Sequence, residues 1–216
     1  MGIAVTGLGV VSALGFGTEA NLHGLGQERM PIAPAAQLAG SHLSFPVAEV
    51  PASNRQLSER AALRFHPNVP RTALLGLIAC QEAIRDAGVA PASERVGLVL
   101  GTTTGGMDIT ERHFTLDGRV DERRGYWLRY HGCGDVTAWI ANQLGIGYYD
   151  TLSTACSSGA NAIMLGAILL EQHRLDTVVC GGMDALCRFT LNGFNSLGLI
   201  SSEPCKPFDA NRCGLT

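Results

Sequence analysis

Charge is scarce in this sequence, and no long run of one sign occurs. Of its 216 residues, 16 are lysine or arginine and 19 are aspartate or glutamate, which gives a formal net charge of −3 at pH 7. Proteins that bind nucleic acids carry clustered positive charge on one face or along one helix. The charge balance therefore argues against a nucleic-acid partner.

Long apolar runs and secretion signals are also missing. No apolar stretch approaches the roughly 20 residues that a membrane-spanning helix needs. The N-terminal segment MGIAVTGLGVVSALG has no basic residues and is interrupted by glycine, which is unlike a signal peptide. The seven cysteines form no CxxC pair, and an odd, scattered set is typical of reduced thiols. We therefore expect a cytoplasmic protein without a metal ion or cofactor.

Hydrophobic residues make up 46% of the sequence, and their pattern predicts an α/β fold. Three apolar runs are typical of strands and two segments of helices: residues 3–11, 96–100 and 176–185 for the strands, and 71–88 and 135–144 for the helices. The second helix is predicted to have Asp135 as its N-cap and Gly145 as its end. Alternating strands and helices favour a largely parallel sheet, in one domain over residues 1–216.

The segment DTLSTACSSGANAIMLGAILLEQ places a cysteine between a strand-like stretch and a long apolar segment. We expect a helix from Cys156 to about His173 that is apolar on nearly all sides and therefore buried. In its first turn, backbone N–H groups and the helix dipole stabilise a thiolate. A strand-to-helix turn that presents such a residue predicts a nucleophile, although a small buried core residue explains the cysteine equally well.

Several motifs now point to one family. STACSSG is similar to the active-site signature of β-ketoacyl-acyl-carrier-protein synthases, the condensing enzymes with the thiolase fold. The other matching segments, in order, are IAVTGLGVVSALG, LIACQEAIRDAG, VGLVLGTTTGG, VVCGGMDA and KPFDANRCG. The resemblance covers nearly the whole chain apart from residues 112–130. It implies a layered α/β/α/β/α fold with a mostly parallel sheet and a buried central helix, of which this chain is the N-terminal half.

The resemblance also implies a reaction. Cys156 accepts an acyl chain from acyl carrier protein as a thioester, and its backbone N–H stabilises the oxyanion. A malonyl thioester on the carrier then loses carbon dioxide, and its carbanion attacks the acyl-enzyme in a Claisen condensation of fatty-acid biosynthesis. A polyketide or aryl-polyene pathway is one alternative, and a non-catalytic half-synthase that needs a complementary chain is another. The cysteine argues against the non-catalytic chain-length-factor type.

Further positions take roles by resemblance. Thr104 and Phe194 match positions that line or gate the acyl pocket, with Phe194 expected on a loop; ordinary turn and core roles are the alternatives. Arg64 and Arg71 flank the helix that contributes carrier-docking residues in relatives. The segment Tyr148–Thr154 matches the strand that pairs across the two-fold axis of family dimers, which implies a homodimer.

Two departures from the family pattern limit these expectations. The family's two catalytic histidines, its lysine and a Gly/Phe loop lie in the C-terminal half, and this sequence ends at Thr216 before that half begins. None of the six histidines present lies in a matching motif, and we assign none to catalysis. Cys213 stands where the family usually has aspartate, which predicts that Arg212 has one acidic partner fewer.

Overall fold

A computed structural model describes residues 2–27, 31–38, 45–113 and 128–215. The chain packs into two compact units, which are Met1–Gly9 with Asn54–Ala185 and Val10–Ser53 with Leu186–Thr216. The single domain expected over residues 1–216 stays a prediction. None of the described helices combines the length and the hydropathy needed to cross a membrane.

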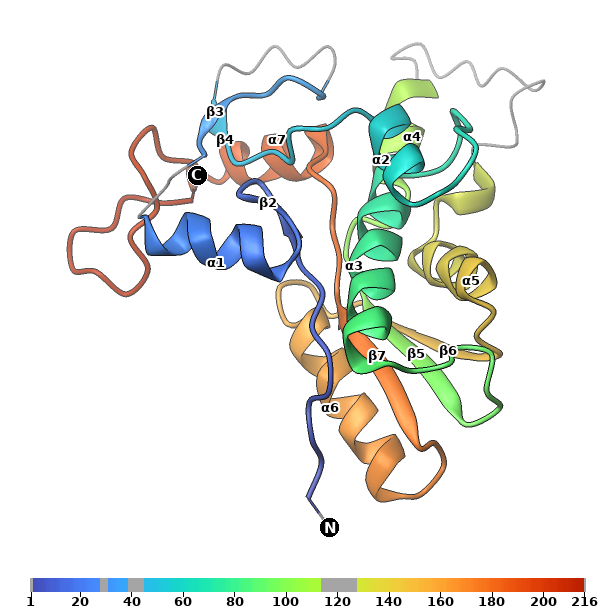
Figure 1. The fold of residues 1–216 in the computed structure, drawn as a ribbon. Coiled ribbons are helices and arrows are strands. Elements are labelled where there is room, and N and C mark those ends of the chain that lie inside the picture. Colours follow the sequence, from blue (N-terminus) through green and yellow to red (C-terminus); the bar gives the residue numbers. More distant parts are fainter. Residues whose placement is uncertain (1, 28–30, 39–44, 114–127, 216) are drawn as a thin grey trace. The chain divides into compact units, whose positions relative to one another are not determined.

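A three-stranded parallel sheet forms the centre of the first unit (Figure 1). Its strands are β5 (Val96–Gly101), β6 (Tyr148–Leu152) and β7 (Thr177–Gly182), in the order β6-β5-β7. All six residues of β5 are buried, as expected of a central strand in a sheet that is covered on both faces. The apolar runs around β5 and β7 were thus correctly predicted as strands.

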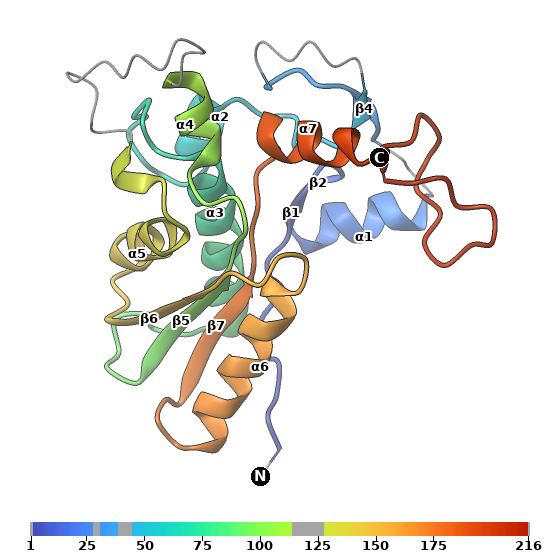
Figure 2. The same cartoon turned by 180° about the vertical axis from the view of Figure 1, so that it is seen from behind.

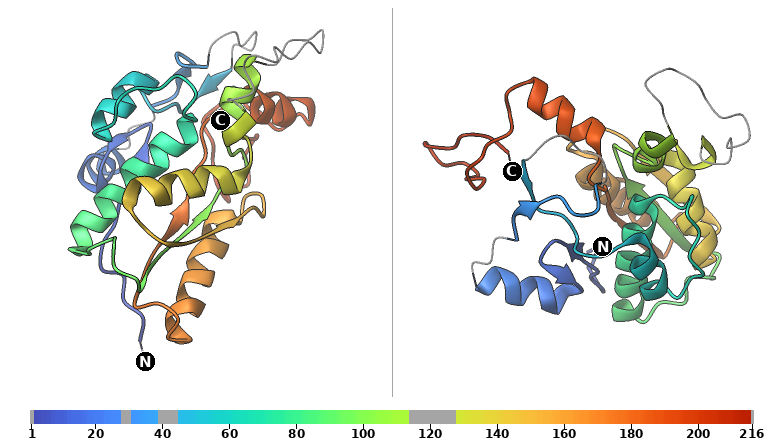
Figure 3. Two further views of the ribbon diagram at one scale, coloured as in Figure 1. Left: turned by 90° about the vertical axis from the view of Figure 1, so that its right-hand side faces the viewer. Right: turned by 90° about the horizontal axis from the view of Figure 1, so that it is seen from above.

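Helices cover both faces of this sheet. Helices α3 (Arg71–Ala87) and α5 (Cys133–Leu144) lie on one side, and α6 (Ser158–Glu171) lies on the other (Figure 3). The shorter α2 (Asn54–Arg60) packs on α3, and α4 (Met107–His113) follows β5. The arrangement confirms the predicted α/β class with a parallel sheet, because each helical layer buries its apolar side against the strands.

The two predicted helices of the first layer form where expected, with one correction at a terminus. Gly88 and Gly145 end α3 and α5 in left-handed conformations, with φ of 64° and 71°. Helix α5 begins earlier than predicted, with Gly132 as its N-cap instead of Asp135. The carboxylate of Asp135 lies one turn further on and accepts the backbone N–H of Gly132 at 3.2 Å, so its acidic side chain caps the helix from the third helical position.

The apolar segment near the N-terminus, predicted as a strand over residues 3–11, is not a strand except at its final residue. It runs beside α3 instead (Figure 1). A Cβ placed on Gly9 would lie 1.9 Å from the carbonyl oxygen of Ala79, and the N–H of Leu8 donates to Asp86 Oδ2 at 2.9 Å. The prediction was wrong because glycine lets this backbone pack directly on α3. Asp86 of that helix accepts the N–H of Leu8, which would otherwise donate to a neighbouring strand.

Helix α6 was expected to be buried nearly all round, and the structure corrects this expectation. Ala162 and Leu169 are buried and pack with Val99 of β5. The opposite face of the helix is open, because the sheet covers only one side of it within the described residues. The exposed side chains of this face, called here the open face of α6, are Ile163, Met164 and Ile168, which are 56%, 57% and 38% exposed.

The described residues of the second unit form short strands and two helices. Its elements are β1 (Val11–Ser12), β2 (Gly15–Phe16), α1 (Thr18–Gly26), β3 (Ala33–Pro34), β4 (Pro46–Val47) and α7 (Arg188–Ser196). The side chain of Asn21 donates to the carbonyls of Gly15 and Gly17, at 3.2 and 2.7 Å. It thereby ties α1 to the turn before it. Phe194 lies in α7, so the prediction of a loop at this residue was wrong.

Candidate active site

The three strands of the first unit end side by side at one edge of the sheet (Figure 2). Gly101 of β5 pairs with Leu152 of β6 and with Gly182 of β7. The turns that follow the three strands therefore meet at this edge. Ligands in parallel α/β sheets gather at the carboxyl ends of the strands, which makes these turns the candidate site.

Cys156 lies in the turn between β6 and α6, and it is exposed. The helix begins at Ser158 with Ser157 as its N-cap, so Cys156 precedes the helix instead of occupying its first turn as predicted. Ala155 has a φ of 54°, a left-handed conformation that is strained for a residue with a side chain. This sharp reversal leaves the cysteine at the surface, beside the N–H groups at the start of α6.

Hydrogen bonds to the carbonyl of Ala155 hold the strained turn. This oxygen accepts the backbone N–H of Ser158 at 3.1 Å, the hydroxyl of Ser158 at 2.6 Å and the hydroxyl of Thr103 at 3.1 Å. Ser158 is buried, and its Oγ also accepts the N–H of Thr154 at 2.9 Å. Because the donors come from two different segments, the backbone immediately before Cys156 is fixed relative to the sheet.

Glycines let the start of α6 rest directly on the strand ends. A Cβ placed on Gly101 would lie 2.4 Å from the carbonyl carbon and oxygen of Ser158. A Cβ placed on Gly182 would lie 3.0 Å from the Cα of Gly159. A side chain at either position would push the helix away from the sheet. Because both positions are glycine, the start of α6 and the turn that carries Cys156 can lie directly on the ends of β5 and β7.

Asp184, two residues beyond the end of β7, gathers the turn that follows β5. Its Oδ1 accepts the hydroxyl of Thr102 at 2.7 Å, the N–H of Thr103 at 3.0 Å, and the N–H and hydroxyl of Thr104 at 3.0 and 2.8 Å. Sequence reasoning selected Thr104 and missed Thr103 and Asp184. The sequence does contain a signal for both residues, since each follows an apolar strand. Only the pairing of β5 with β7 shows that the two polar residues lie close together.

The two residues predicted to line the acyl pocket lie in different units. Thr104 is in the first unit, beside the Cys156 turn, and its hydroxyl is bound by Asp184. Phe194 belongs to the second unit and is 39% exposed. A common pocket for the two side chains stays a prediction.

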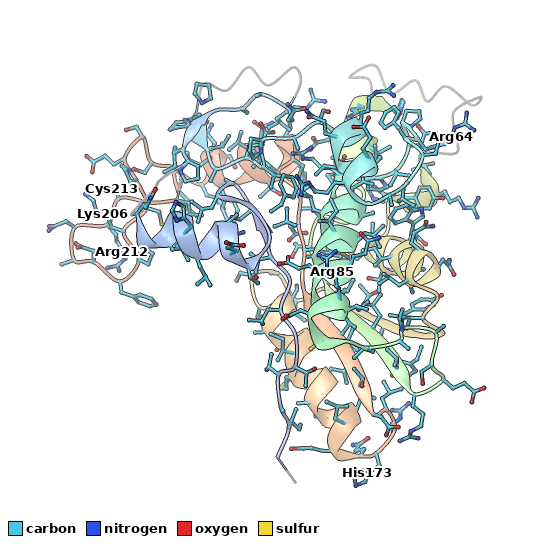
Figure 4. All side chains as sticks on the ribbon, viewed as in Figure 1. Arg64, Arg85, His173, Lys206, Arg212 and Cys213 are labelled. Atoms are coloured by element: carbon cyan, nitrogen blue, oxygen red, sulfur yellow. The ribbon has the colours of Figure 1, made fainter. Side chains whose placement is uncertain are left out.

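The two arginines predicted to dock the carrier differ in exposure. Arg64 is exposed (Figure 4). Arg71 is only 5% exposed; its N–H donates to Asp108 Oδ2 and its guanidinium to Asn54 Oδ1, both at 3.0 Å. Burial in this cluster raises the pKa of Asp108. The docking role of Arg71 stays a prediction, and the burial and hydrogen bonds of this side chain do not favour it.

The thiols of the first unit differ in their surroundings. Burial of Cys80 in α3 raises the pKa of its thiol to about 12, and burial also raises the pKa of Cys180 in β7. Cys133, at the start of α5, is partly exposed, with Sγ 3.8 Å from the carbonyl oxygen of Thr103. A thiol that stays protonated is a weak nucleophile. Burial therefore leaves Cys80 and Cys180 poorly suited to react, whereas Cys156 is open to solvent.

Cys213 lies in an exposed loop of the second unit. The Arg212 guanidinium donates to the backbone carbonyl oxygen of Asp209 at 2.9 Å, and Cys213 Sγ lies 3.9 Å from Glu203 Oε2. Lys206 pairs with the same glutamate at 3.1 Å. Figure 4 shows Lys206, Arg212 and Cys213 on this loop. Among the described residues, the partner of the Arg212 guanidinium is this backbone carbonyl, and the loss of an acidic partner through Cys213 stays a prediction.

Comparison with solved structures defines the class of protein first. A structure described as the ishigamide ketosynthase/chain length factor matches with a TM-score of 0.84 and 24% identity, over 97% of this chain and 54% of that chain. A likeness at this identity establishes the fold. The chain therefore has the thiolase-like fold of the ketosynthases, as predicted.

The sequence then shows the family. The model of the family "Beta-ketoacyl synthase, N-terminal domain" matches residues 2–216. The tetracenomycin polyketide synthase ketoacyl synthase alpha subunit of Streptomyces glaucescens is 29% identical over 247 residues, covering 99% of this chain and 54% of the relative. The 3-oxoacyl-[acyl-carrier-protein] synthase 1 of Escherichia coli (strain K12) is 27% identical over 233 residues, covering 98% and 55%. The chain belongs to the β-ketoacyl synthase family and spans about half the length of these curated relatives.

Proposed function

We propose that this chain provides the acyl-accepting site of a β-ketoacyl-acyl-carrier-protein synthase, with Cys156 as the nucleophile. The thiolate of Cys156 attacks the carbonyl carbon of an acyl thioester on the carrier. The carbonyl electrons move to oxygen, and when they return the bond to the carrier sulfur breaks. The acyl group is then a thioester of Cys156, and the carrier thiolate takes up a proton from water.

The observation that carries this proposal is the exposed Cys156 on a strained, hydrogen-bonded turn at the start of α6. An exposed thiol can be reached by an acyl group held on another protein. The N–H groups and the positive end of the helix dipole favour negative charge at this place. They support both the thiolate and the oxyanion of the tetrahedral intermediate, which we assign to the backbone N–H of Cys156.

The condensation follows acylation in the proposed sequence. Malonyl-acyl-carrier-protein loses carbon dioxide, and the electron pair of the broken C–C bond becomes a carbanion stabilised as an enolate. The carbanion attacks the acyl carbonyl carbon, and the bond to Cys156 sulfur breaks to release a β-ketoacyl carrier. We assign the groups that stabilise the enolate to the C-terminal half of the family, so that residues 1–216 by themselves perform only the acylation.

Fatty-acid biosynthesis is the pathway that we propose first, in line with the Escherichia coli relative. A polyketide pathway is the second candidate. It is favoured by the Streptomyces glaucescens relative, which has the higher identity of the two. In either pathway Cys156 has the same role, and its presence distinguishes the chain from a chain-length factor.

Acyl carrier protein is the partner that we propose for the exposed arginines of the first unit. The name of the Escherichia coli relative includes this carrier, and carrier proteins of this kind are acidic. Arg64 is exposed, and so are Arg55 and Arg60 of the neighbouring α2. Opposite charges on two surfaces accelerate and orient their association. We therefore place the docking surface around Arg64.

A homodimer is proposed for the complete enzyme. Within the described part of the chain, β6 pairs with β5 on one side and has no strand on the other. Its residue Tyr149 is 46% exposed. An edge strand with an open side can pair with the same strand of a second copy. This supports the segment Tyr148–Thr154 as the dimer contact.

Acyl transfer to the chain tests the proposal. The 216-residue chain is incubated with a short-chain acyl-carrier protein, and its intact mass and peptide masses are measured. We expect the mass to rise by one acyl group on the peptide that contains Cys156. Cys156→Ala should prevent the gain, whereas Cys205→Ala, which removes another exposed thiol, should not.

The same samples test the division of the reaction between the two halves. With malonyl-carrier protein added, the chain should release no carbon dioxide beyond a protein-free control. Acylation at another cysteine would refute Cys156 as the nucleophile. A β-ketoacyl product formed by residues 1–216 alone would refute the assignment of the enolate-stabilising groups to the other half.

A further inference from the structure

We propose that Thr103 and Asp184 are positioning residues that hold the Cys156 turn in its reactive geometry, an inference that rests on the proposed role of Cys156. The hydrogen bonds of the two side chains within the described residues go to groups other than the thiol. The two residues act through two hydrogen-bonded links, from Asp184 to the backbone of Thr103 and from the Thr103 hydroxyl to the carbonyl of Ala155.

The first link fixes the turn after β5. One carboxylate oxygen of Asp184 accepts two backbone N–H groups and two hydroxyls from Thr102, Thr103 and Thr104, and its other oxygen lies 3.3 Å from the Thr103 nitrogen. A carboxylate oxygen has room for about two ordinary hydrogen bonds. The four donors therefore share Oδ1, and three consecutive threonines are gathered around Asp184, whose side chain is exposed to water.

The second link passes from that turn to the nucleophile. Thr103 uses its N–H toward Asp184, its hydroxyl toward Ala155, and its carbonyl oxygen as an acceptor for Cys133 Sγ at 3.8 Å. All of its polar groups are thus engaged between the ends of β5, β7, β6 and the start of α5. Thr103 is consequently held in one orientation, and its hydroxyl can serve as a fixed donor.

The strain at Ala155 explains why this donor matters. A left-handed conformation at a residue with a Cβ persists only where the surroundings hold it. Two of the three donors to the Ala155 carbonyl belong to Ser158 of the same turn, so the Thr103 hydroxyl is the donor that links this carbonyl to another segment. The Thr103 hydroxyl anchors the turn to the sheet. Without it, the Ala155 carbonyl keeps only the donors of its own turn, so the strained backbone at Ala155 can relax and displace the thiol of Cys156 while Ser158 stays on Gly101.

Alkylation of Cys156 measures this geometry without a carrier or an acyl substrate. The 216-residue chain is treated with limiting iodoacetamide between pH 6 and 9, and adducts at Cys156 and at exposed Cys205 are followed by peptide mass. We expect Thr103→Val, which removes the hydroxyl but keeps the shape, to slow alkylation of Cys156 about tenfold, because a thiol displaced from the N–H groups at the start of α6 loses their stabilisation of the reactive thiolate. Thr103→Ser should restore the rate, and Cys205 should react equally in all variants.

Two further variants separate positioning from general damage. Thr177→Val makes the same exchange at the opposite end of β7 and should leave Cys156 unaffected. Asp184→Ala should slow Cys156 as Thr103→Val does, and the double variant should be no slower than either single variant, because both act along one path. Thermal unfolding identifies any variant that does not fold. If Thr103→Val does not fold, alkylation of Cys156 in Thr103→Ser still tests whether a hydroxyl at position 103 is sufficient.

Each outcome decides a different point. Cys156 reacting in Thr103→Val as in Thr177→Val, or fully additive effects of Thr103→Val and Asp184→Ala, would overturn the positioning role and leave the nucleophile in place. Cys156 reacting no faster than Cys205 in the unaltered chain would argue against the nucleophile itself. A selective loss at Cys156 that serine restores supports the inference.

Discussion

At the scale of single residues, several arginines of the first unit are exposed and could meet an acidic partner. Arg64 follows α2, and Arg85 lies near the C-terminal end of α3 (Figure 4). The two side chains have the same charge and are both exposed, so they differ mainly in location. This makes them a matched pair for testing where an acidic partner binds.

Charge reversal at Arg64 should weaken transfer from the carrier. We expect Arg64→Glu to raise the KM for acyl-carrier protein several-fold at low ionic strength, with less effect in high salt, because added ions screen exposed charges. Transfer from a small acyl thioester without the carrier should not change. Steady-state acylation of Cys156 at several salt concentrations measures both. Arg85→Glu is the control, and an equal loss in that variant would argue against a docking surface around Arg64.

At the scale of secondary-structure elements, contact between backbones sets the position of α6. Gly101→Ala would place a Cβ 2.4 Å from the backbone of Ser158, and backbone atoms cannot move aside as a flexible side chain can. We expect this substitution to lower the free energy of unfolding by about 1–3 kcal/mol, as overpacking does. Urea unfolding followed by circular dichroism measures the change.

A second glycine provides the control for this substitution. Gly134 lies in the first turn of α5, and a Cβ placed there would meet no atom within 4 Å. Gly134→Ala should raise the free energy of unfolding by about 0.4–1 kcal/mol, because alanine restricts the unfolded chain. Gly101→Ala should also slow alkylation of Cys156, whereas Gly134→Ala should not. Similar stability changes in the two variants would contradict the close backbone contact.

The type of a secondary-structure element was predicted correctly where the segment has a clear pattern of apolar residues. Helix α3 and strands β5 and β7 form where the apolar pattern placed them. The segment over residues 3–11 has an equally apolar pattern and failed as a strand, because a strand also needs a neighbour for its hydrogen bonds. The neighbour of this segment is helix α3, and the residues of the segment itself do not predict which element they pack against.

At the scale of the whole molecule, the open face of α6 leaves apolar side chains in contact with water. Ile163 and Met164 are both more than half exposed. We expect the 216-residue chain to self-associate at micromolar concentration, since apolar patches of this kind favour contact with one another. Replacing both residues with glutamate should shift the chain toward monomer, as measured by size exclusion with light scattering.

A charge control isolates the apolar contribution to self-association. Gln172→Glu adds a negative charge at the end of α6 and removes no apolar surface. It should leave the association unchanged. A monomeric unaltered chain, or equal dissociation by the control, would show that the open face of α6 does not drive association.

The sequence by itself determined the α/β class, the family and the choice of Cys156 as the candidate nucleophile. Each of these depends on residues that are adjacent in the chain or separated by a helical or strand period, such as STACSSG before an apolar helix. These features can be predicted from the sequence because the residues that form the element are also the residues of the motif.

Only the tertiary structure decided what surrounds Cys156. Thr103 is 52 residues from Ala155 and 81 from Asp184 along the chain, and these three meet because parallel β5, β6 and β7 end in register. The same holds for Arg64 and Arg71, which sequence treated alike and packing separated into an exposed and a buried residue. The physical reason is that register and burial depend on which distant segments pack together, and no short stretch of sequence contains that information.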